Sequence, residues 1–490
     1  MRRALPLLLI LASLALVAAG CGSSDTSSGS GFDEALGYVP KTSGVVVAIK
    51  TDPDDPQYKD LNALVDKFPF ASTIKSRIKS SVEGSGTSYE DDIKPALGND
   101  LVVGIPTSGL NAPEGTSTPF ILAWKANDDV DKIIGKNNRK VGETEGATIY
   151  QGSSNYFGVK DNLVVASKDR SLLDTALRTG SSDDGLSEDE FNAALGDLDK
   201  DALVRVEGNI QTLLAKDPDA AEALRVPWVK GLRTFGVAAS AADDGVTVDF
   251  AVKTEGVTAE QQPLASGPAA APVVKRPGEV GVGQRGIEQT VKFALDVVNV
   301  TDPKSLLKKD KVGKQLGVDL DRDVIDQLAG NAASSFALDG GVAVRTDLKD
   351  AAAFKKTLAT IMKNIPKAQR AQGKPVSTIK PGPGGLYTVT EPGDEPQVVG
   401  VIGDKLVIAS DEDRAKEFAA QSASPVEGTE GALAFTADPK AIVAEALKRR
   451  GNSGAAALIA PALTSHLEAL DGSVQAGADG LRGSVKLAVR

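Results

Sequence analysis

The sequence predicts an α+β protein with two tandem, related domains, each a mainly antiparallel sheet with helices packed on it. One observation behind this prediction is a pattern that occurs twice, FGVKDNLVVASKDRSLL at residues 157–173 and GVIGDKLVIASDEDRAKE at residues 400–417. In both copies a polar pair precedes an apolar run and an acidic stretch, which indicates a hairpin turn, a buried strand and the start of a helix. A second observation is that short turns separate most strand-like runs, and hairpin connections favour an antiparallel layer over a doubly wound sheet.

Length, composition and charge limit the number of domains, the kind of core and the class of partner. The chain has 490 residues, of which 41% are hydrophobic and only 4% aromatic. This length favours two domains of ordinary size, with cores built from small and branched aliphatic side chains. The formal net charge is -11, and removal of a leader that contains Arg2 and Arg3 makes the chain more acidic still. Repulsion from phosphate argues against a nucleic-acid partner.

The first 20 residues are typical of an export signal. Arg2 and Arg3 precede an apolar run over residues 5–17, which is too short to span a membrane and has the length of a signal h-region. Small residues follow and end at Gly20, and the next residue, Cys21, is the one cysteine of the chain. This resembles the lipobox of bacterial lipoproteins, so cleavage after Gly20 and acylation of Cys21 are expected. The alternative is an ordinary cleavage site beside an incidental cysteine.

Acylation of Cys21 predicts an extracytoplasmic protein that is lipid-anchored to the cell membrane, because several acyl chains give stable attachment. Residues 21–34 are then the lipidated cysteine and a flexible tether, since GSSDTSSGSG at 22–31 has nothing to bury. A single cysteine excludes disulfides within the chain.

The first α+β domain is expected at residues 35–254. The β-branched run at 45–49 predicts a buried strand, and Leu61, Leu64, Val65 and Phe68 recur at helical spacing. Further strands are expected at 101–103, 120–124, 148–150, 156–159, 163–166, 203–206, 235–240 and 246–252, with helices from about 128, 168 and 188.

A Pro/Ala-rich linker is expected at residues 255–276, because its prolines among small and polar residues are typical of an extended spacer. The second α+β domain then follows at 277–490 and repeats the order of the first. Residues 432–435 correspond to the strand at 203–206, and the runs 474–478 and 485–489 correspond to the closing hairpin. Several matches in one order indicate duplication of a single unit.

The leader, residues 35–68 and the two copies together resemble a family of actinobacterial exported lipoproteins known as domain of unknown function 3352. Tyr38-Val39-Pro40, the strand after it and the Asp-Pro-Asp loop at 52–54 carry the most specific part of this resemblance. The resemblance implies export, anchoring and a role without catalysis. It implies no cofactor and no catalytic residue.

The stretch Gly281-Val282-Gly283-Gln284-Arg285-Gly286 matches a dinucleotide-binding pattern ahead of a helical segment at 287–297. The aligned window of the first copy, at 47–52, contains no glycine, and no parallel βαβ alternation follows. A nucleotide site is therefore not predicted.

The carboxylates Asp319, Asp321, Asp323 and Asp326 are spaced like those at the start of a calcium-binding loop. Such a loop needs glycine and glutamate at two later positions, but Val324 and Gly330 occupy them. Helix capping explains these carboxylates equally well. His466, the one histidine, lies in a helical pattern at 461–470, and its neighbour Ser465 points elsewhere on a helix. No metal or catalytic residue is assigned.

Two lysine-rich stretches, at 304–314 and 363–374, could face anionic lipid but are more typical of solvated helix faces. The function predicted is a non-catalytic binding or structural module of the cell envelope, whose partners are the membrane and an envelope macromolecule. Two alternatives are a carrier of a hydrophobic ligand and a hydrolase with a carboxylate pair.

Overall fold

The fold is described from a computed structural model, which covers residues 29–82, 88–110, 118–128, 130–215, 220–301, 309–338, 340–449, 461 and 464–490. The chain divides into two compact units. Unit 1 consists of Met1–Pro218, Arg233–Val252 and Val489–Arg490, and unit 2 consists of Asp219–Leu232 and Lys253–Ala488. Cys21 and Gly20 lie outside the described residues.

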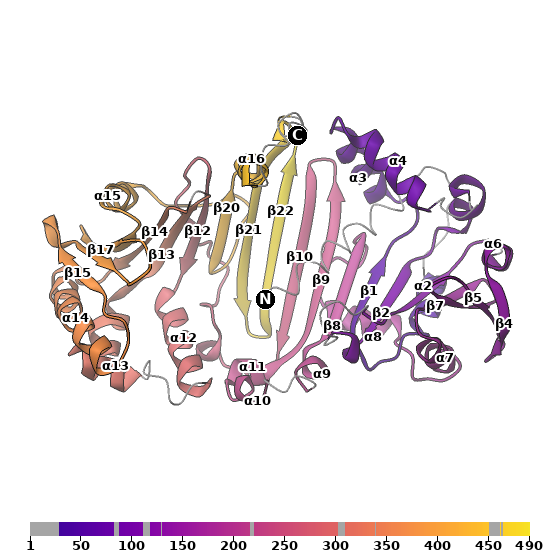
Figure 1. Cartoon of the computed structure of the whole chain (residues 1–490), viewed down its shortest axis with the longest axis horizontal. Helices are drawn as coiled ribbons and strands as arrows, with labels where there is room; N and C mark the ends of the chain where they lie inside the picture. Colours follow the sequence, from indigo (N-terminus) through magenta and orange to yellow (C-terminus); the bar gives the residue numbers. More distant parts are fainter. Residues whose placement is uncertain are drawn as a thin grey trace. The chain divides into compact units, whose positions relative to one another are not determined.

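Unit 1 is built on an antiparallel sheet (Figure 1). Its strands are β1 (Ser43–Ile49), β2 (Leu101–Pro106), β3 (Ile121–Lys125), β4 (Arg139–Thr144), β5 (Ala147–Gln151), β6 (Tyr156–Lys160), β7 (Leu163–Ser167), β8 (Val204–Asn209), β9 (Leu232–Ala242) and β10 (Gly245–Thr254). Strand pairing gives the order β4-β5-β6-β7-β3-β2-β1-β8-β9-β10. The α+β class predicted from the sequence is confirmed.

The helical segments of unit 1 are α2 (Gly29–Leu36), α3 (Pro56–Asp66), α4 (Ala71–Val82), η2 (Tyr89–Ile93), η3 (Lys94–Ala96), α5 (Thr107–Leu110), α6 (Val130–Asn137), α7 (Arg170–Thr179), α8 (Glu188–Leu195) and α9 (Ile210–Leu214). Helices α2, α7 and α8 share one buried core with the sheet, through Phe32, Leu173 and Phe191. Helix α6 packs on the opposite face: Val164 belongs to its cluster, whereas Val165 belongs to the core under α7.

Helix α2 corrects one expectation about the tether. The glycine- and serine-rich composition predicted a flexible stretch as far as residue 34, but the helix begins at Gly29 and Phe32 is buried in the core. Phe32 and Leu36 are four residues apart, so they lie on one helix face, and their burial outweighs the low helix propensity of the neighbouring glycines.

The strands of unit 2 are antiparallel as well (Figure 1). Its strands are β12 (Glu279–Arg285), β13 (Leu328–Ala337), β14 (Val342–Leu348), β15 (Thr378–Pro381), β16 (Tyr387–Thr390), β17 (Gln397–Ile402), β18 (Lys405–Ala409), β20 (Leu433–Ala437), β21 (Leu467–Gly477) and β22 (Gly480–Val489), with a separate pair β11 (Pro272–Val273) and β19 (Ser424–Pro425). The order is β15-β16-β17-β18-β14-β13-β12-β20-β21-β22.

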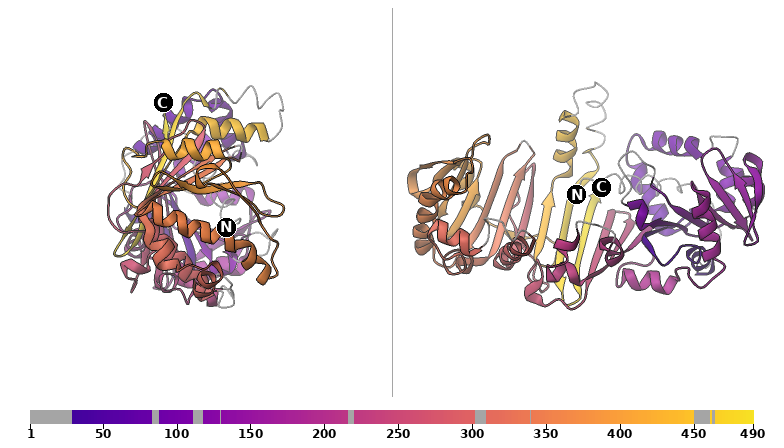
Figure 2. Two further views of the ribbon diagram at one scale, coloured as in Figure 1. Left: turned by 90° about the vertical axis from the view of Figure 1, so that its left-hand side faces the viewer. Right: turned by 60° about the horizontal axis from the view of Figure 1, so that its bottom comes forward.

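The helical segments of unit 2 are α10 (Ala220–Ala223), α11 (Pro227–Gly231), η4 (Ala259–Gln261), α12 (Ile287–Thr301), α13 (Lys309–Leu316), η5 (Leu320–Val324), η6 (Ile325–Gln327), α14 (Ala351–Ala371), η7 (Pro383–Gly385), α15 (Glu412–Ala420) and α16 (Pro439–Arg449). Helices α15 and α14 cover opposite faces of the sheet, because Val407 packs with α15 and its neighbour Leu406 packs with α14. Helix α16 lies at one end of β20 and β21 (Figure 2).

The two strand orders correspond one to one from β4 and β15 to β10 and β22. One row of directly paired residues crosses the core-facing side of both sheets. In unit 1 it contains Arg205, Ala48, Val102, Ala123 and Val165, and in unit 2 it contains Ala434, Gly283, Ala333, Arg345 and Val407. The same spacing from Val165 and Val407 places Asp169 and Asp411 as the N-caps of α7 and α15.

This correspondence shifts the alignment expected from sequence by one residue. Alignment by residue similarity matches Asp161-Asn162 with Asp404-Lys405. In the structure, the two-residue turn at Asp161-Asn162 corresponds to the turn at Gly403-Asp404. The turn needs positive φ at its first position, and Asp161 (φ 50) and Gly403 (φ 61) both supply it. Turn geometry sets the register here more strongly than residue identity does.

The stretch 255–276 belongs to unit 2 and packs on it, whereas its composition predicts an extended spacer between two domains. Gln262 is fully buried, and its Nε2 donates a hydrogen bond of 2.5 Å to the Gly477 carbonyl oxygen. Strand β11 crosses over β12, where a Cβ at Gly281 would lie 2.7 Å from the Val274 oxygen and a Cβ at Gly283 would collide with the Pro272 carbonyl. The glycines that look like a nucleotide motif therefore let this segment lie directly on the sheet.

The helix predicted at 461–470 is wrong in its second half, because Leu467–Gly477 forms β21 and pairs with β20. Leu467 and Leu470 have helical spacing, but the sheet hydrogen bonds and the burial of Leu467 outweigh that local pattern. Among the helices in the described ranges, none has both the length and the apolar composition that a membrane crossing requires.

Candidate functional site

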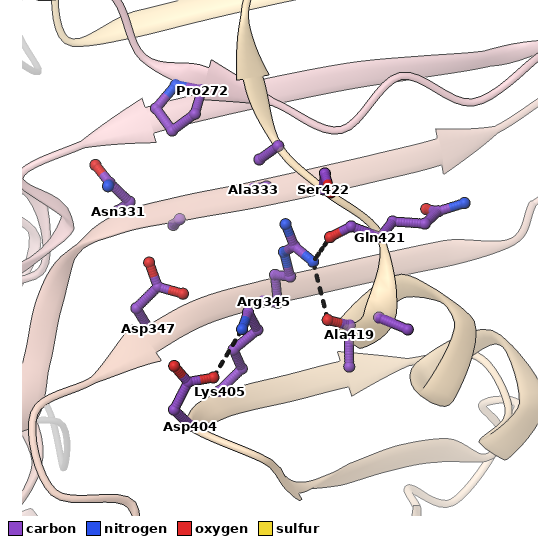
Figure 3. A pocket seen from close by; sticks show the side chains of 13 residues that line it. Pro272, Asn331, Ala333, Arg345, Asp347, Asp404, Lys405, Ala419, Gln421 and Ser422 are labelled. Carbon is purple, nitrogen blue, oxygen red and sulfur yellow. Dashed lines mark hydrogen bonds and ion pairs between the residues drawn. The ribbon is translucent and has the colours of Figure 1, made fainter.

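A pocket of about 600 Å³ lies in unit 2 between the ends of β13, β14 and β18 and the chain that leaves α15 (Figure 3). Its lining includes the charged side chains Arg345, Asp347, Asp404 and Lys405. Pro272, Asn331 and five alanines around positions 332–333 and 419–423 complete most of the rest. Small side chains on both walls leave the space that the charged groups face.

Strand β14 has an arginine, Arg345, at a buried position of the kind that apolar residues usually occupy. Ala343 and Arg345 are both buried, and alternation along the strand puts them on the face that α15 covers. Arg345 lies opposite Ala333 on β13 and Val407 on β18. Arg345 is only 6% exposed. A buried arginine needs hydrogen-bond acceptors, since it stays protonated inside proteins.

The end of α15 supplies the acceptors for one edge of the guanidinium. Nη1 of Arg345 donates hydrogen bonds to the carbonyl oxygens of Phe418 at 2.7 Å, Ala419 at 3.1 Å and Gln421 at 2.5 Å. The guanidinium carbon also lies 5.4 Å from the centroid of the Phe418 ring. The partial negative charge at a helix C-terminus favours a cation at this position.

The other edge of the guanidinium faces the pocket. Nε and Nη2 of Arg345 make no hydrogen bond to the described residues, and none of the described carboxylates lies within ion-pair distance of this side chain. In Figure 3 the terminal nitrogen of Arg345 that carries no dashed line points away from Ala419. Burial lowers the pKa of Arg345, and the negative charges of Asp347 and Asp404 act against that effect.

The mouth of the pocket carries the opposite charge. Asp347 lies opposite Lys405 in the β14–β18 ladder, and Nζ of Lys405 forms an ion pair of 2.7 Å with Asp404. The hydrogen bond from Lys405 lowers the pKa of Asp404, whose side chain is 72% exposed. Two carboxylates balance two cations, so the lining is neutral overall but has a buried positive end and an exposed negative end.

Unit 1 has no such arrangement at the matching position, where Ala123 replaces Arg345. Its buried arginine, Arg205, lies on β8 and forms an ion pair with the buried carboxylate of Asp100. Two residues along β8, burial raises the pKa of Glu207 to about 7. These three groups belong to the packed interior of unit 1.

The residues singled out in the sequence lie elsewhere. Asp319 caps η5 by accepting hydrogen bonds from the Asp321 and Arg322 amides, and Asp323 pairs with Arg322 at 2.7 Å. Over the described ranges, no group of three His, Cys, Asp or Glu residues is placed to hold a metal ion. His466 directly precedes β21.

Sequence reasoning missed Arg345 altogether. The available signal was a single arginine at an inward-facing position of the alternating run Val342-Ala343-Val344-Arg345. An ion in such a position is costly unless it is paired or used.

The fold and the pocket define an α+β protein whose second unit carries a candidate ligand site. The chain belongs to a family of unknown function: the model of that family, described as protein of unknown function (DUF3352), matches residues 4–378. This match confirms the domain of unknown function that the sequence resembled.

No curated protein matches the chain. Among solved structures, crystal form IV of TP0453 is similar at 10% identity over 44% of this chain and 79% of that chain, with a TM-score of 0.27. Crystal form III of TP0453 is similar at 11% identity over 46% and 80% of the two chains, with a TM-score of 0.26.

Proposed function

We propose that the protein is an exported lipoprotein, anchored outside the cytoplasm through Cys21, and that it acts as a binding module of the cell envelope without catalysing a reaction. The leader that ends at Gly20 supports the anchoring. The pocket at Arg345 supports the binding role, because a buried cation with no described carboxylate in ion-pair range lines a pocket of about 600 Å³ and can attract an anion.

We further propose that the domains at 35–254 and 277–490 are copies of one ancestral unit. The support is the shared strand order and the shared position of the α7 and α15 caps. Among the described residues, the second copy carries the open arginine site and the first has Ala123 at the matching position, so we propose that the copies have diverged in function.

The character of the pocket favours binding of a polar ligand over the alternatives of a hydrophobic carrier and a hydrolase. Charged side chains line it at its base and its mouth. A general acid needs a raised pKa, whereas the pKa of Asp404 is lowered by Lys405. The carboxyl group with a strongly raised pKa, Glu207, lies in the interior of unit 1.

Anchoring is tested by fractionating cells that express Cys21→Ser, with Ser23→Ala as a matched change in the same stretch. We expect Cys21→Ser to leave the membrane fraction and Ser23→Ala to stay in it. Equal membrane association of both variants contradicts the anchoring.

Binding is tested by native mass spectrometry of protein released from its host. Ala420 lines the pocket from the exposed end of α15, so Ala420→Phe fills the pocket without removing Arg345 or its acceptors. We expect a bound small molecule in the natural protein and its loss in Ala420→Phe. Retention of every bound species in Ala420→Phe contradicts binding at this site.

A further inference from the structure

We infer that the pocket takes a small zwitterion, an amino acid or short peptide, whose carboxylate meets Arg345 inside the pocket and whose ammonium group faces Asp347 and Asp404. This inference rests on the proposed binding function and names its ligand class. Three features of the lining carry it: the free edge of the guanidinium, the separation of charge, and the small side chains of the walls.

The free edge of Arg345 selects a planar anion. Nη1 is fully used by the three carbonyl oxygens at the end of α15, which also hold the guanidinium in place. Nε and Nη2 remain as two parallel donors on one side of the group. Carboxylates accept such a pair of N–H groups side-on, and a charge-assisted bond in a buried position is stronger than one in water.

The distribution of charge selects a ligand with no net charge. Arg345 is 6% exposed, whereas the side chain of Asp404 at the mouth is 72% exposed. A phosphate dianion at Arg345 would be repelled by Asp347 and Asp404, the two carboxylates whose charge already acts on Arg345. An ammonium group toward the mouth turns the same carboxylates into favourable partners.

The walls select a compact ligand with a short spacer between its charges. The alanines at 332, 333, 419, 420 and 423 line a volume of about 600 Å³, which is within the range of small-molecule sites. Asn331 also lines the pocket, and its side chain makes no hydrogen bond to the described residues, so its amide is available to a peptide group.

Isothermal titration of the full mature protein with L-alanyl-L-alanyl-L-alanine tests the inference. The tripeptide amide removes the carboxylate, and the N-acetyl tripeptide removes the ammonium group. We expect binding of the tripeptide, a loss of about 10- to 100-fold with the amide, and a loss of about 2- to 5-fold with the N-acetyl form because the mouth is exposed.

Three variants accompany the titration. Ala420→Phe should abolish binding, and Arg345→Met should weaken it as much as the amide does. Arg370→Met, which removes an exposed arginine of α14, should bind like the natural protein. Because Arg345→Met also removes contacts within the fold, Ala420→Phe is the variant that decides whether the pocket is the site.

The outcomes separate the two proposals. Absence of heat with the tripeptide, or equal binding of tripeptide and amide, overturns the zwitterion. If host-derived protein still carries a molecule that Ala420→Phe loses, the binding function stands with another ligand class. If Ala420→Phe changes neither the titration nor the host-derived ligand, both proposals fail.

Discussion

Unit 1 and unit 2 each bury an arginine in the same cross-strand row, but they neutralise it differently. In unit 1 Arg205 is paired with Asp100, and its guanidinium carbon lies 4.5 Å from the centroid of the Phe32 ring and 5.7 Å from that of Phe191. In unit 2 Arg345 is held by backbone carbonyls and opens onto a pocket. Carbonyls satisfy hydrogen bonds, but they do not cancel a charge. The charge of Arg345 in unit 2 can therefore still attract an anion, whereas the charge of Arg205 in unit 1 is already balanced by Asp100.

The largest effect on stability is expected from a change at Asp100, which removes the partner of the buried arginine in unit 1. Asp100→Ala leaves the buried charge of Arg205 without a partner, and we expect a loss of about 3–5 kcal/mol in the free energy of unfolding. Urea denaturation followed by tryptophan fluorescence measures this loss. The double variant Asp100→Ala/Arg205→Met should recover most of it, since no buried charge then remains. A cost below about 1 kcal/mol for Asp100→Ala means that the ion pair does not neutralise Arg205.

Glu207 makes the stability of unit 1 depend on pH. Burial raises the pKa of Glu207 from 4.5 in an unfolded chain to about 7, so the folded state holds the proton more tightly. Stability from this group is fully present below about pH 4.5 and is lost as pH rises toward 7, by up to about 3 kcal/mol.

Glu207→Gln keeps a neutral side chain at all pH values, so denaturation curves at pH 5 and pH 8 should differ less in this variant than in the natural protein. Glu468→Gln, at an exposed position of β21 in unit 2, is a control that should leave the difference unchanged. An identical pH dependence in Glu207→Gln and the natural protein would show that Glu207 is not the titrating group.

Arg345→Met should destabilise unit 2 by only about 1–2 kcal/mol, less than Asp100→Ala costs unit 1. The variant removes three hydrogen bonds to the end of α15, but it leaves no buried charge, and the pocket admits water to the freed carbonyls. Urea denaturation of both variants under one condition gives the comparison. A larger loss for Arg345→Met than for Asp100→Ala contradicts the view that unit 2 tolerates an open site.

The smallest effect is expected at the helix caps. Asp169 accepts hydrogen bonds from two amides of α7, Ser171 and Leu172, whereas Asp411 accepts one from the Arg414 amide of α15. Asp169→Ala and Asp411→Ala should each lower the free energy of unfolding by about 1 kcal/mol, with the larger loss for Asp169→Ala. Thermal unfolding of the two variants side by side measures which one loses more stability. A larger loss for Asp411→Ala would mean that side-chain contacts other than the cap hydrogen bonds dominate.

Much of the fold was readable from sequence because it depends on local patterns. Strands such as β1 and β7 are runs of buried aliphatic residues, and the turn at Asp161-Asn162 has the residues that its geometry needs. Strand β4 escaped prediction, since it is exposed along most of its length and shows no apolar alternation. The first part of β21, Leu467–Leu470, escaped because pairing with β20 outweighs the helical spacing of its leucines, whereas its last residues were predicted as part of the closing hairpin.

The candidate site was not readable in the same way. Arg345 stands out only once its partners are known, and those partners are carbonyls of a helix that begins 67 positions later in the chain, at Glu412. The space in front of it depends on alanines from β13 and from the end of α15. Likewise, Gly281 and Gly283 suggested phosphate binding until the crossing of β11 supplied a packing reason.

Nitrogen-15 NMR of arginine side chains tests the central claim most directly, because it observes both buried arginines in one sample. On addition of L-alanyl-L-alanyl-L-alanine, the Nε resonance of Arg345 should shift and that of Arg205 should stay in place. Assignments come from the Arg345→Met and Arg205→Met/Asp100→Ala variants. A shift at Arg205, or none at Arg345 when the tripeptide is saturating, contradicts the claim that unit 2 alone keeps an open anion site.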